Sequence, residues 1–437
     1  MNTNPRIVET ASLGEATLPS PLRRTSRPGD GKAKFVPAER YVRHPAEITA
    51  TGPPEKELWF EKAGAREQIF FDPQNTRAAI VTCGGLCPGL NDVIRSLFLE
   101  LHMNYGVKNI LGIRHGYLGL NEQAGEPPLV LSMETVEDIH RAGGTILGTS
   151  RGPQDTAAMV DLLEKQAVNI LFCIGGDGTQ RGAHQIYEEC SRRGAKIAIV
   201  GIPKTIDNDI EFCARSFGLV SAVEQAEKVI GCAHVESKGA VNGIGLVKVM
   251  GRDAGFIAVY ATLASQDVNF TLIPETPFAL YGEKGFLNVL RERILARKHA
   301  VIVVAEGAGQ DLFSGEKVER DASGNIKHHD IGLFLRDEIN RFFAQQGPKI
   351  DLKYMDPSYF IRSGPANCDD SILCDQFGRQ AAHAAMAGKT DVLIGYQCST
   401  FVHLPISLAT AEKRQVQVEG ELWASVLAAT GQPRFFE

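Results

Sequence analysis

Short apolar runs alternate with helix-like segments along most of the chain, and this alternation restricts the fold more than any other feature of the sequence. β-Branched and other apolar residues form strand-like runs at 78–82, 110–113, 170–174, 197–202, 244–250, 271–273, 301–305 and 392–396. Helical patterns lie between several of these runs, at 91–101, 179–193, 219–235 and 282–298. Alternating strands and helices require crossover connections, which give largely parallel sheets covered by helices. The sequence therefore predicts an α/β fold.

The number of strands exceeds what one compact α/β domain needs in a chain of 437 residues. We expect two Rossmann-like three-layer lobes with mainly parallel sheets and a cleft between them. The expected parts are an N-terminal arm, partly disordered, at 1–75, a first lobe at 76–218 plus 361–405, a second lobe at 219–360, and a C-terminal extension at 406–437.

The overall charge and hydropathy exclude several classes of protein. Lys and Arg number 46 against 52 Asp and Glu, a formal net charge of −6, so there is no general cationic field to bind nucleic acid or an anionic membrane. No apolar run approaches the ~18 residues of a membrane-spanning helix. The nine cysteines lack metal-site spacing, and the first thirty residues lack the apolar core of a secretory signal. We expect a cytoplasmic protein with reduced, buried thiols.

Two glycine-rich turns follow strand-like runs and precede helices. The first is Cys-Gly-Gly-Leu-Cys-Pro-Gly-Leu-Asn at 83–91, and the second is Gly-Gly-Asp-Gly-Thr at 175–179. Glycines at the start of a helix let backbone N–H groups approach an anion, and the carboxylate of Asp177 can hold Mg²⁺ directly or through water. Each turn could instead be a purely structural connection, with Asp177 as a helix cap. The lysine-containing P-loop signature is absent.

A third turn carries two carboxylates. The sequence Pro-Lys-Thr-Ile-Asp-Asn-Asp occupies 203–209, directly after the strand-like run that ends at Ile202. In an extended loop, Asp207 and Asp209 would project to the same side, roughly 6 to 7 Å apart. One carboxylate could then take a proton from a substrate hydroxyl while the other helps to place a metal. The alternative is a solvated, turn-forming pair.

Together with Met250-Gly251-Arg252, these motifs resemble those of the phosphofructokinase family, in the family's order. The resemblance runs from about residue 77 to about residue 407 and is closest to the longer ATP-dependent branch of plants, trypanosomatids and some bacteria. It implies that the first lobe binds a nucleotide and the second a sugar phosphate. It also implies a glycolytic kinase that transfers the γ-phosphoryl group of ATP to the 1-hydroxyl of fructose 6-phosphate.

The resemblance also implies roles for individual residues. Asp207 matches the general base, with Thr205, Asp209 and Arg151 completing the catalytic set. The nucleotide side comprises Gly85, Tyr117, Arg151, Gly152, Gly176, Asp177, Gly178 and Thr179, and Asp177 is the implied Mg²⁺ ligand. The sugar-phosphate side comprises Thr205, Ile206, Asp207, Met250, Gly251, Arg252, Glu306, Tyr359, Phe360, Ile361 and Arg362. Two positions depart from shorter bacterial members, where arginines stand in place of Gly243 and Lys353.

Two residues bear on the phosphoryl donor and point in different directions. The resemblance implies that pyrophosphate-using members of the family carry a carboxylate at the position of Gly178, where it would crowd and repel a nucleotide's α-phosphate. Lys204 is shared with pyrophosphate users, although its charge attracts either donor. We therefore expect ATP, with pyrophosphate as the alternative.

Two further alternatives remain. One is a kinase of another ketose phosphate, such as sedoheptulose 7-phosphate, and the other is a non-catalytic nucleotide or phospho-sugar sensor. The resemblance also implies a homo-oligomer, a tetramer or a dimer.

Overall fold

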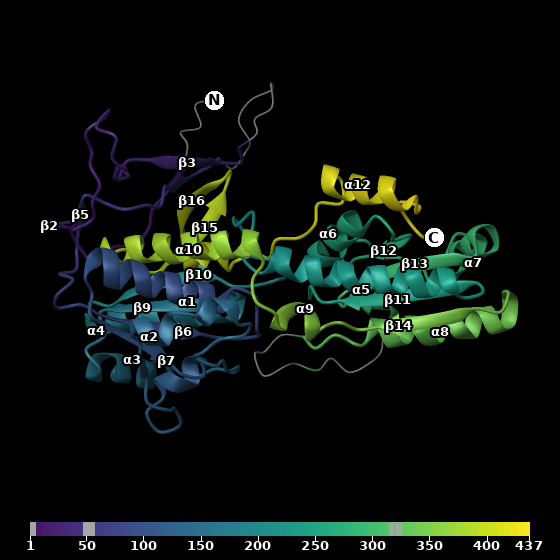
Figure 1. The fold of residues 1–437 in the computed structure, drawn as a ribbon, viewed down its shortest axis with the longest axis horizontal. Coiled ribbons are helices and arrows are strands. Elements are labelled where there is room, and N and C mark those ends of the chain that lie inside the picture. Colours follow the sequence, from purple (N-terminus) through teal and green to yellow (C-terminus); the bar gives the residue numbers. More distant parts are fainter. Residues whose placement is uncertain (1–5, 47–56, 314–318, 320–325) are drawn as a thin grey trace. The chain divides into compact units, whose positions relative to one another are not determined.

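The computed structural model describes residues 6–46, 57–313, 319 and 326–437 (Figure 1). These residues form two compact units, each with its own sheet and helices. Unit 1 lies within 1–205, 210–218 and 365–413, and unit 2 within 206–209, 219–364 and 414–437. The expectation of an α/β fold with mainly parallel sheets is confirmed.

The sheet of unit 1 has seven strands in the order β16-β15-β10-β9-β6-β7-β8. The inner strands pair in parallel, whereas β8 and β16 are antiparallel at the two edges. The strands are β6 (Arg77–Thr82), β7 (Asn109–Ile113), β8 (Leu129–Val130), β9 (Ile170–Gly175), β10 (Ala198–Pro203), β15 (Val392–Gln397) and β16 (Thr400–Pro405). Every residue of β9 and β10 is buried, which explains why both read as unbroken apolar runs.

Helices cover this sheet in two groups. In one group α1 packs against α10, and in the other α4 packs against α3 and α11 (Figure 1). Both α10 and α4 contact β10. The helices are α1 (Leu90–Leu99), α2 (Met133–Val136), α3 (Thr156–Lys165), α4 (Asp177–Arg193), α10 (Cys368–Met386) and α11 (Ile406–Ala409).

The sheet of unit 2 is wholly parallel, with the order β12-β13-β11-β14. Its strands are β11 (Gly243–Val249), β12 (Phe270–Leu272), β13 (His299–Ala305) and β14 (Asp351–Met355). Its helices are α5 (Leu219–Gly239), α6 (Phe256–Ser265), α7 (Phe286–Arg297), α8 (Ile331–Gln346), α9 (Phe360–Ser363) and α12 (Glu421–Thr430). The sequence patterns did not predict α6, α8, α12 or β14.

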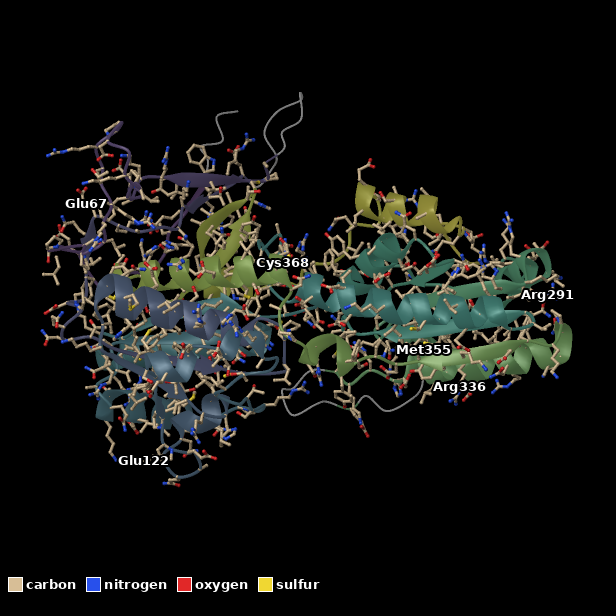
Figure 2. The ribbon with its side chains drawn as sticks, viewed as in Figure 1. Glu67, Glu122, Arg291, Arg336, Met355 and Cys368 are labelled. Atoms are coloured by element: carbon tan, nitrogen blue, oxygen red, sulfur yellow. The ribbon has the colours of Figure 1, made fainter. Side chains whose placement is uncertain are left out.

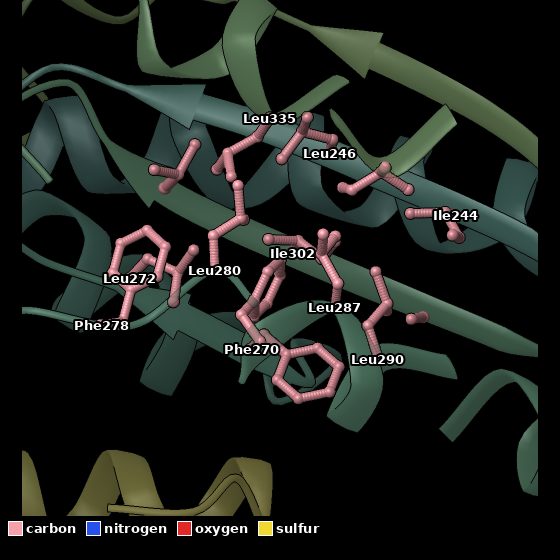
Figure 3. Close-up of a cluster of buried hydrophobic side chains, with 14 of the residues drawn as sticks. Ile244, Leu246, Phe270, Leu272, Phe278, Leu280, Leu287, Leu290, Ile302 and Leu335 are labelled. Atoms are coloured by element: carbon pink, nitrogen blue, oxygen red, sulfur yellow. The ribbon is translucent and has the colours of Figure 1, made fainter. Parts of the chain in front are cut away.

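Strand β11 shows how the two faces of the unit 2 sheet are formed. Ile244 and Leu246 join a buried cluster with α7 and α8 residues such as Leu290 and Leu335 (Figure 3). The alternate positions Gly243 and Gly245 face α5, where a Cβ at Gly245 would come within 2.9 Å of the Cβ of Ala233. The absence of side chains on this face therefore allows α5 to pack closely on the sheet.

The N-terminal segment belongs to unit 1, although we expected a separate and partly disordered arm at 1–75. Within the described residues it forms β1 (Arg6–Val8), β2 (Leu18–Pro19), β3 (Tyr41–His44), β4 (Leu58–Glu61) and β5 (Gln68–Ile69). Strand β4 pairs with both β1 and β3 and contacts β16. The prediction missed these strands because short strands depend on distant partners. Residues 1–5 and 47–56 of the expected arm lie outside the described residues.

A buried carboxylate anchors this segment. Glu61 accepts from Nη2 of Arg66 at 2.7 Å and from Nζ of Lys389, which lies between α10 and β15, at 2.6 Å. Burial alone would raise the pKa of the Glu61 carboxyl, but hydrogen bonding and charge from His403 and Lys389 outweigh burial and hold the pKa well below its usual range. Glu61 therefore remains ionised and joins residues far apart in the sequence.

The C-terminal residues divide between the units, whereas we expected one extension at 406–437. Residues 406–413 belong to unit 1, and residues 414–437 belong to unit 2, where α12 packs against α6. The other boundaries also differ from the expected ones, because 206–209 lie in unit 2 and unit 1 resumes at 365. Three of the nine thiols, at Cys232, Cys368 and Cys398, are exposed rather than buried. Among the described residues, no helix is long and apolar enough to cross a membrane.

We expect the substitution Glu61→Gln to lower the free energy of unfolding by about 3 to 5 kcal/mol, because it removes one partner of a buried ion pair. A carboxyl whose pKa is lower in the folded state stabilises the protein above about pH 4.3 and loses this contribution as the pH falls further. The difference from the unsubstituted protein should therefore shrink in acid. Denaturant titrations at several pH values measure both effects.

The matched control is Glu67→Gln in the same N-terminal segment, where the exposed carboxylate accepts from the hydroxyl of Ser26 (Glu67 is labelled in Figure 2). Its expected change is within about 0.5 kcal/mol. Equal effects of the two substitutions would contradict the role given to Glu61.

Candidate active site

Three strands of unit 1 end together, so the turns that follow them start at one edge of the sheet. Thr82 of β6 is in register with Ile174 of β9, which is in register with Ile202 of β10. The turn at 83–89 follows β6, the turn at 175–178 ends β9, and Lys204 and Thr205 follow β10. The structure therefore brings Gly85, Gly178 and Thr205 to the same edge, as parallel pairing predicts.

Hydrogen bonds connect the first turn to two other segments. Nζ of Lys204 donates to the carbonyl oxygen of Gly85 at 2.7 Å. The hydroxyl of Thr149 donates to the carbonyl oxygen of Gly84 at 2.6 Å, and the N–H of Gly84 donates to the carbonyl oxygen of Ser150 at 3.1 Å. These bonds hold Thr149 and Ser150 next to the turn, and the exposed Arg151 and the half-buried Gly152 follow directly in the chain.

The second turn begins α4. Gly176 is the N-cap, and its carbonyl oxygen accepts the N–H of Thr179 at 2.9 Å. The side-chain amide of the buried Gln180 donates to the carbonyl oxygens of Gly175 at 2.9 Å and Ile202 at 3.2 Å, which ties the ends of β9 and β10 together. The positive end of the α4 dipole therefore lies at this edge, where it favours an anion.

Asp177 and Gly178 lie in the first turn of α4. Asp177 pairs with Nη1 of Arg181, one helical turn further on, at 2.5 Å. Gly178 is exposed, and a Cβ added to it would meet no atom within 4 Å, so the space beside this residue is open. The backbone therefore leaves room for a bulky ligand at Gly178.

Tyr117 packs against the first turn of α4. It is 8 % exposed, its hydroxyl donates to the carbonyl oxygen of Thr179 at 2.7 Å, and its ring lies against Gly182 of α4. Burial raises the pKa of the Tyr117 phenol well above its usual value, so the phenol stays protonated and keeps donating. The sequence indicated a nucleotide contact here, and the structure gives Tyr117 the additional task of fixing the first turn of α4.

The third turn continues into four residues that belong to unit 2. Asp207 and Asp209 are each 9 % exposed, and Ile206 before them is buried. Asn208 has a φ of 57°, in the left-handed region, so the loop is not extended as we expected. The alternation rule for extended chains therefore does not describe how these two carboxylates project.

Unit 2 also gathers its candidate residues at one edge. Val249 of β11 is in register with Ala305 of β13, and the neighbouring Val247 is in register with Met355 of β14. The residues that follow these strands are therefore neighbours: Met250, Gly251 and Arg252 after β11, Glu306 after β13, and the segment 356–362 after β14.

Arg252 connects two of these positions with the aspartate loop. Its backbone N–H donates to Oε1 of Glu306 at 3.0 Å, and its Nε lies 3.9 Å from Oδ2 of Asp207. Arg252 has a φ of 50° and Gly251 a φ of 139°, so this turn has an unusual backbone. The turn therefore presents a guanidinium group to Asp207.

The segment 356–362 begins with a charged anchor. Nζ of Lys248 lies 2.8 Å from Oδ2 of Asp356 and 2.9 Å from Oδ2 of Asp330. Burial would lower the pKa of Lys248, but the hydrogen bonds that its ammonium donates to the two carboxylates outweigh burial and raise the pKa. The lysine therefore stays charged and fixes the start of the segment.

The predicted sugar-phosphate residues of this segment are not equally accessible. Tyr359 is 75 % exposed and Phe360 is 57 % exposed, and the guanidinium of Arg362 lies over the Tyr359 ring, 4.9 Å from its centroid. Ile361 is completely buried, so its side chain packs inside unit 2 and only its backbone could reach a ligand. Tyr359 and Arg362 thus form an accessible pair.

Gly243, one of the two departures from the shorter bacterial pattern, has a structural explanation. A Cβ at Gly243 would come within 2.2 Å of the carbonyl oxygen of Ser237 in α5. An arginine therefore does not fit here without displacing α5. Lys353 lies on β14 and pairs with Asp351 at 3.0 Å.

The donor set fits a magnesium ion that is shared with a substrate. No group of three or more His, Cys, Asp or Glu side chains among the described residues could hold a metal alone. Mg²⁺ usually takes one or two protein carboxylates together with substrate phosphates and water. The Asp177 carboxylate, partly exposed at a helix N-terminus, suits this mode.

Chain connectivity limits the distance between candidate residues of the two units. Thr205 ends the first stretch of unit 1, and Asp207 follows two residues later in unit 2. Two residues of chain span at most about 7 Å. The Cα atoms of Thr205 and Asp207 are therefore at most about 7 Å apart.

The sequence analysis missed residues that support these positions. Arg181 could have been found from its spacing of four residues after Asp177, which places both on one helix face. Ser216, whose hydroxyl donates to the carbonyl oxygen of Thr205 at 2.6 Å, and Arg414, whose N–H donates to that of Asp209 at 3.0 Å, have no such local signal.

Comparisons with known proteins agree with this arrangement. Residues 77–385 match the family described as Phosphofructokinase. An "ATP-dependent 6-phosphofructokinase" of Borreliella burgdorferi is 47 % identical over 97 % of this chain and 96 % of its own length. The "ATP-dependent 6-phosphofructokinase 7" of Arabidopsis thaliana is 45 % identical over 96 % of this chain and 86 % of its own. An "ATP-dependent 6-phosphofructokinase" of Trypanosoma cruzi is 46 % identical over 85 % and 77 %.

Solved structures show the same fold at lower identity. A pyrophosphate-dependent phosphofructokinase from Marinobacter aquaeolei has a TM-score of 0.67 at 18 % identity, covering 83 % of this chain and 93 % of that one. A Pichia pastoris phosphofructokinase has a TM-score of 0.64 at 20 % identity, covering 92 % and 41 %. At these identities the likeness concerns the fold alone.

The close packing at Gly243 predicts a specific stability change. We expect Gly243→Ala to lower the free energy of unfolding by about 1 to 3 kcal/mol, because the added methyl group overlaps the α5 backbone. The control Gly239→Ala lies at the end of α5, where a Cβ meets nothing within 4 Å, and should be neutral or stabilising. Denaturant titration of both variants measures the contrast, and a neutral Gly243→Ala would contradict the packing argument.

Proposed function

The chain belongs to the phosphofructokinase family, and from this premise we infer that it transfers the γ-phosphoryl group of ATP to the 1-hydroxyl of fructose 6-phosphate. The products are fructose 1,6-bisphosphate and ADP, so the enzyme is a kinase of glycolysis. It is a phosphotransferase with an alcohol group as acceptor.

The position of Asp207 carries the mechanism that we propose. Asp207 lies two residues after Thr205, the last residue of the first unit 1 stretch. Within unit 2, its Oδ2 lies 3.9 Å from Nε of Arg252. A carboxylate there can accept the proton of the 1-hydroxyl as the oxygen attacks the γ-phosphorus. The bond between the γ-phosphorus and the bridging oxygen of ADP breaks as the new bond forms.

The other residues position the reactants and neutralise charge. We propose that the backbone at Gly85 and at 176–179 binds the ATP phosphates. Tyr117 stabilises the first turn of α4 through its hydrogen bond to Thr179. Arg151 and Gly152 stand beside the transferring group. Phosphoryl transfer gains mainly from positioning and charge neutralisation, so the cation beside a glycine-rich backbone suits this reaction.

We propose that residues at the edge of the unit 2 sheet bind fructose 6-phosphate. The charges of Arg252 and Arg362 suit its phosphate, because a planar guanidinium can donate two parallel hydrogen bonds to it. Glu306 fixes the backbone of Arg252. The proposed contacts are Thr205, Ile206, Asp207, Met250, Gly251, Arg252, Glu306, Tyr359, Phe360, Ile361 and Arg362, with Ile361 contributing only its backbone.

We propose that Asp177 holds Mg²⁺ together with the ATP phosphates and that Asp209 lies near it. The ion would neutralise charge on the phosphoryl group. In its absence Asp177 pairs with Arg181, so binding of the ion has to compete with this guanidinium.

The open space at Gly178 favours ATP over pyrophosphate as the donor. A carboxylate in this space would meet a nucleotide with bulk and with like charge. The pyrophosphate-dependent structure from Marinobacter aquaeolei shares the fold and says nothing about the donor at this identity. Initial rates with ATP and pyrophosphate on fructose 6-phosphate, measured side by side, test donor and acceptor together.

The proposal has alternatives for the acceptor and for catalysis, and it includes an oligomeric state and a location. Sedoheptulose 7-phosphate is an alternative acceptor, which the same rate assay tests. A non-catalytic sensor would bind a nucleotide or a phospho-sugar but would show no turnover, whether or not Mg²⁺ is added. The aspartates at 177, 207 and 209 favour an enzyme instead. We also propose a homo-oligomer, a tetramer or a dimer, and a cytoplasmic location.

We expect Gly178→Asp to weaken the use of ATP far more than the binding of fructose 6-phosphate. The open space means that the new side chain fits without displacing neighbours, so its charge causes the loss. The control Gly178→Asn has nearly the same shape without the charge, and it should retain more activity with ATP. Steady-state kinetics with each substrate varied measures the effect. Equal losses for both substrates, or equal effects of Asp and Asn, would contradict the assignment.

We expect Asp207→Asn to lower kcat by about 10² to 10⁴, the usual contribution of a general base, while KM for fructose 6-phosphate stays measurable. The control Asp267→Asn removes a carboxylate of unit 2 that lies 3.5 Å from His234, and it should leave kcat unchanged. Retained turnover in Asp207→Asn would remove Asp207 from its role.

A further inference from the structure

The aspartate loop has a left-handed residue at its centre. Asn208 lies between Asp207 and Asp209 with a φ of 57°. The left-handed conformation is costly for a residue other than glycine, although asparagine tolerates it better than most. Such a conformation persists where surrounding contacts impose it, and these contacts are often part of a mechanism.

Arg414 supplies two of these contacts from a distant part of the chain. Its backbone N–H donates to the carbonyl oxygen of Asp209 at 3.0 Å, and its Nη1 donates to the carbonyl oxygen of Asn208 at 3.4 Å. The carbonyl oxygens of two consecutive loop residues are thus held by one arginine. This arrangement restrains the peptide groups on which both carboxylates are carried.

The guanidinium of Arg414 is itself fixed. It lies over the ring of Phe256, the first residue of α6, at 4.6 Å from the ring centroid. Phe256 is buried, with 2 % of its surface exposed, so the ring is a fixed platform. Stacking on an aromatic face and planar donation are properties of arginine that lysine does not share.

The residues after Arg414 fasten it to the turn that carries Arg252. The side-chain amide of Gln415 donates to the carbonyl oxygen of Asp253 at 3.2 Å. The N–H of Val416 and the N–H of Gly255 both donate to Oε1 of the buried Glu275, each at 2.9 Å. We call residues 414–416 the C-terminal clasp, because they join the aspartate loop to the start of α6.

We propose that Arg414 is a positioning residue for the phosphoryl transfer and that it acts by holding the backbone of the Asp207–Asp209 loop. The proposal rests on the function proposed above, in which Asp207 is the general base. Arg414 acts through the carbonyl oxygens of the loop, so its effect belongs to the placement of the base. Its effect on kcat should therefore exceed its effect on the KM of either substrate.

This role predicts a separation of kinetic constants. Misplacement of a catalytic group by about 1 Å can cost about 10²-fold in rate. Removing the guanidinium should therefore lower kcat by about 10- to 100-fold, while the KM values for ATP and fructose 6-phosphate change by less than about threefold. A residue that only stabilised the fold would lower the melting temperature and leave kcat per folded molecule unchanged.

The experiment compares three full-length variants with the unsubstituted enzyme. Arg414→Gln removes the charge and the stacking, and Arg414→Lys restores the charge and should recover part of the lost kcat. Arg434→Gln is the matched control, because Arg434 is also in unit 2, after α12, and also lies over an aromatic ring, that of Phe435, at 5.5 Å. It contacts no residue of the aspartate loop in the described structure and should behave as unsubstituted. Steady-state kinetics and melting temperatures are measured for each.

A kcat of Arg414→Gln within threefold of the unsubstituted enzyme, at an unchanged melting temperature, would overturn the proposal. So would an equal loss in Arg434→Gln. If Arg414→Gln does not fold, Phe256→Leu decides by the same criterion, because it removes the ring beneath the guanidinium and keeps an apolar side chain in the core.

A double variant separates this proposal from the proposed function. In the Asp207→Asn background, Arg414→Gln should cause little further loss of kcat, because there is no longer a base to place. Full additivity would show that Arg414 acts elsewhere and would overturn the inference alone. If the unsubstituted enzyme does not phosphorylate fructose 6-phosphate, or if Asp207→Asn is fully active, the proposed function fails first.

Discussion

In both units, the hydrogen-bond register between parallel strands decides which turns can meet. In unit 1 the strands β6, β9 and β10 end within one residue of one another. In unit 2 the strands β11 and β13 end level, and β14 ends two residues earlier, with Met355 in register with Val247. A shift of one strand by four residues would move its turn by about 13 Å. The turns would then no longer share an edge, so the candidate site depends first on backbone pairing and only then on its side chains.

The charges near these turns are the second feature of the candidate site. The chain is acidic overall, yet cationic side chains lie beside the turns where phosphates are expected, with Lys204 bonded to Gly85 and Arg252 close to Asp207. Each cation can offset part of a phosphate's charge locally, whatever the net charge of the protein. The helix dipole at the start of α4 acts in the same direction.

Much of this arrangement could be predicted from the sequence, because buried parallel strands read as continuous apolar runs. The run at 170–174 corresponds to β9 (Ile170–Gly175), and the run at 197–202 to β10 (Ala198–Pro203). The turns after them were correctly placed for the same reason. The strand β4 was missed because its few residues form a strand only when β1 and β3 lie beside them.

The aspartate loop shows a different limit of sequence reasoning. Its residue types indicate acid–base chemistry, and asparagine tolerates the left-handed conformation that Asn208 adopts, but the residue type alone does not predict that conformation. One contact that holds Asn208 comes from Arg414, about two hundred residues later. Spacing rules for extended strands or helices do not reach across such a separation, so the direction of the two carboxylates could not be predicted.

Residues 206–209 are a short segment that belongs to unit 2, although the residues on both sides of it belong to unit 1. The proposed base is thus covalently carried by one unit and embedded in the other. A fragment with the main stretches of unit 2, 219–364 and 414–437, would lack residues 206–209. Exchange of either unit for a homologous one would need several junctions in the chain, because each unit is made of three separate stretches.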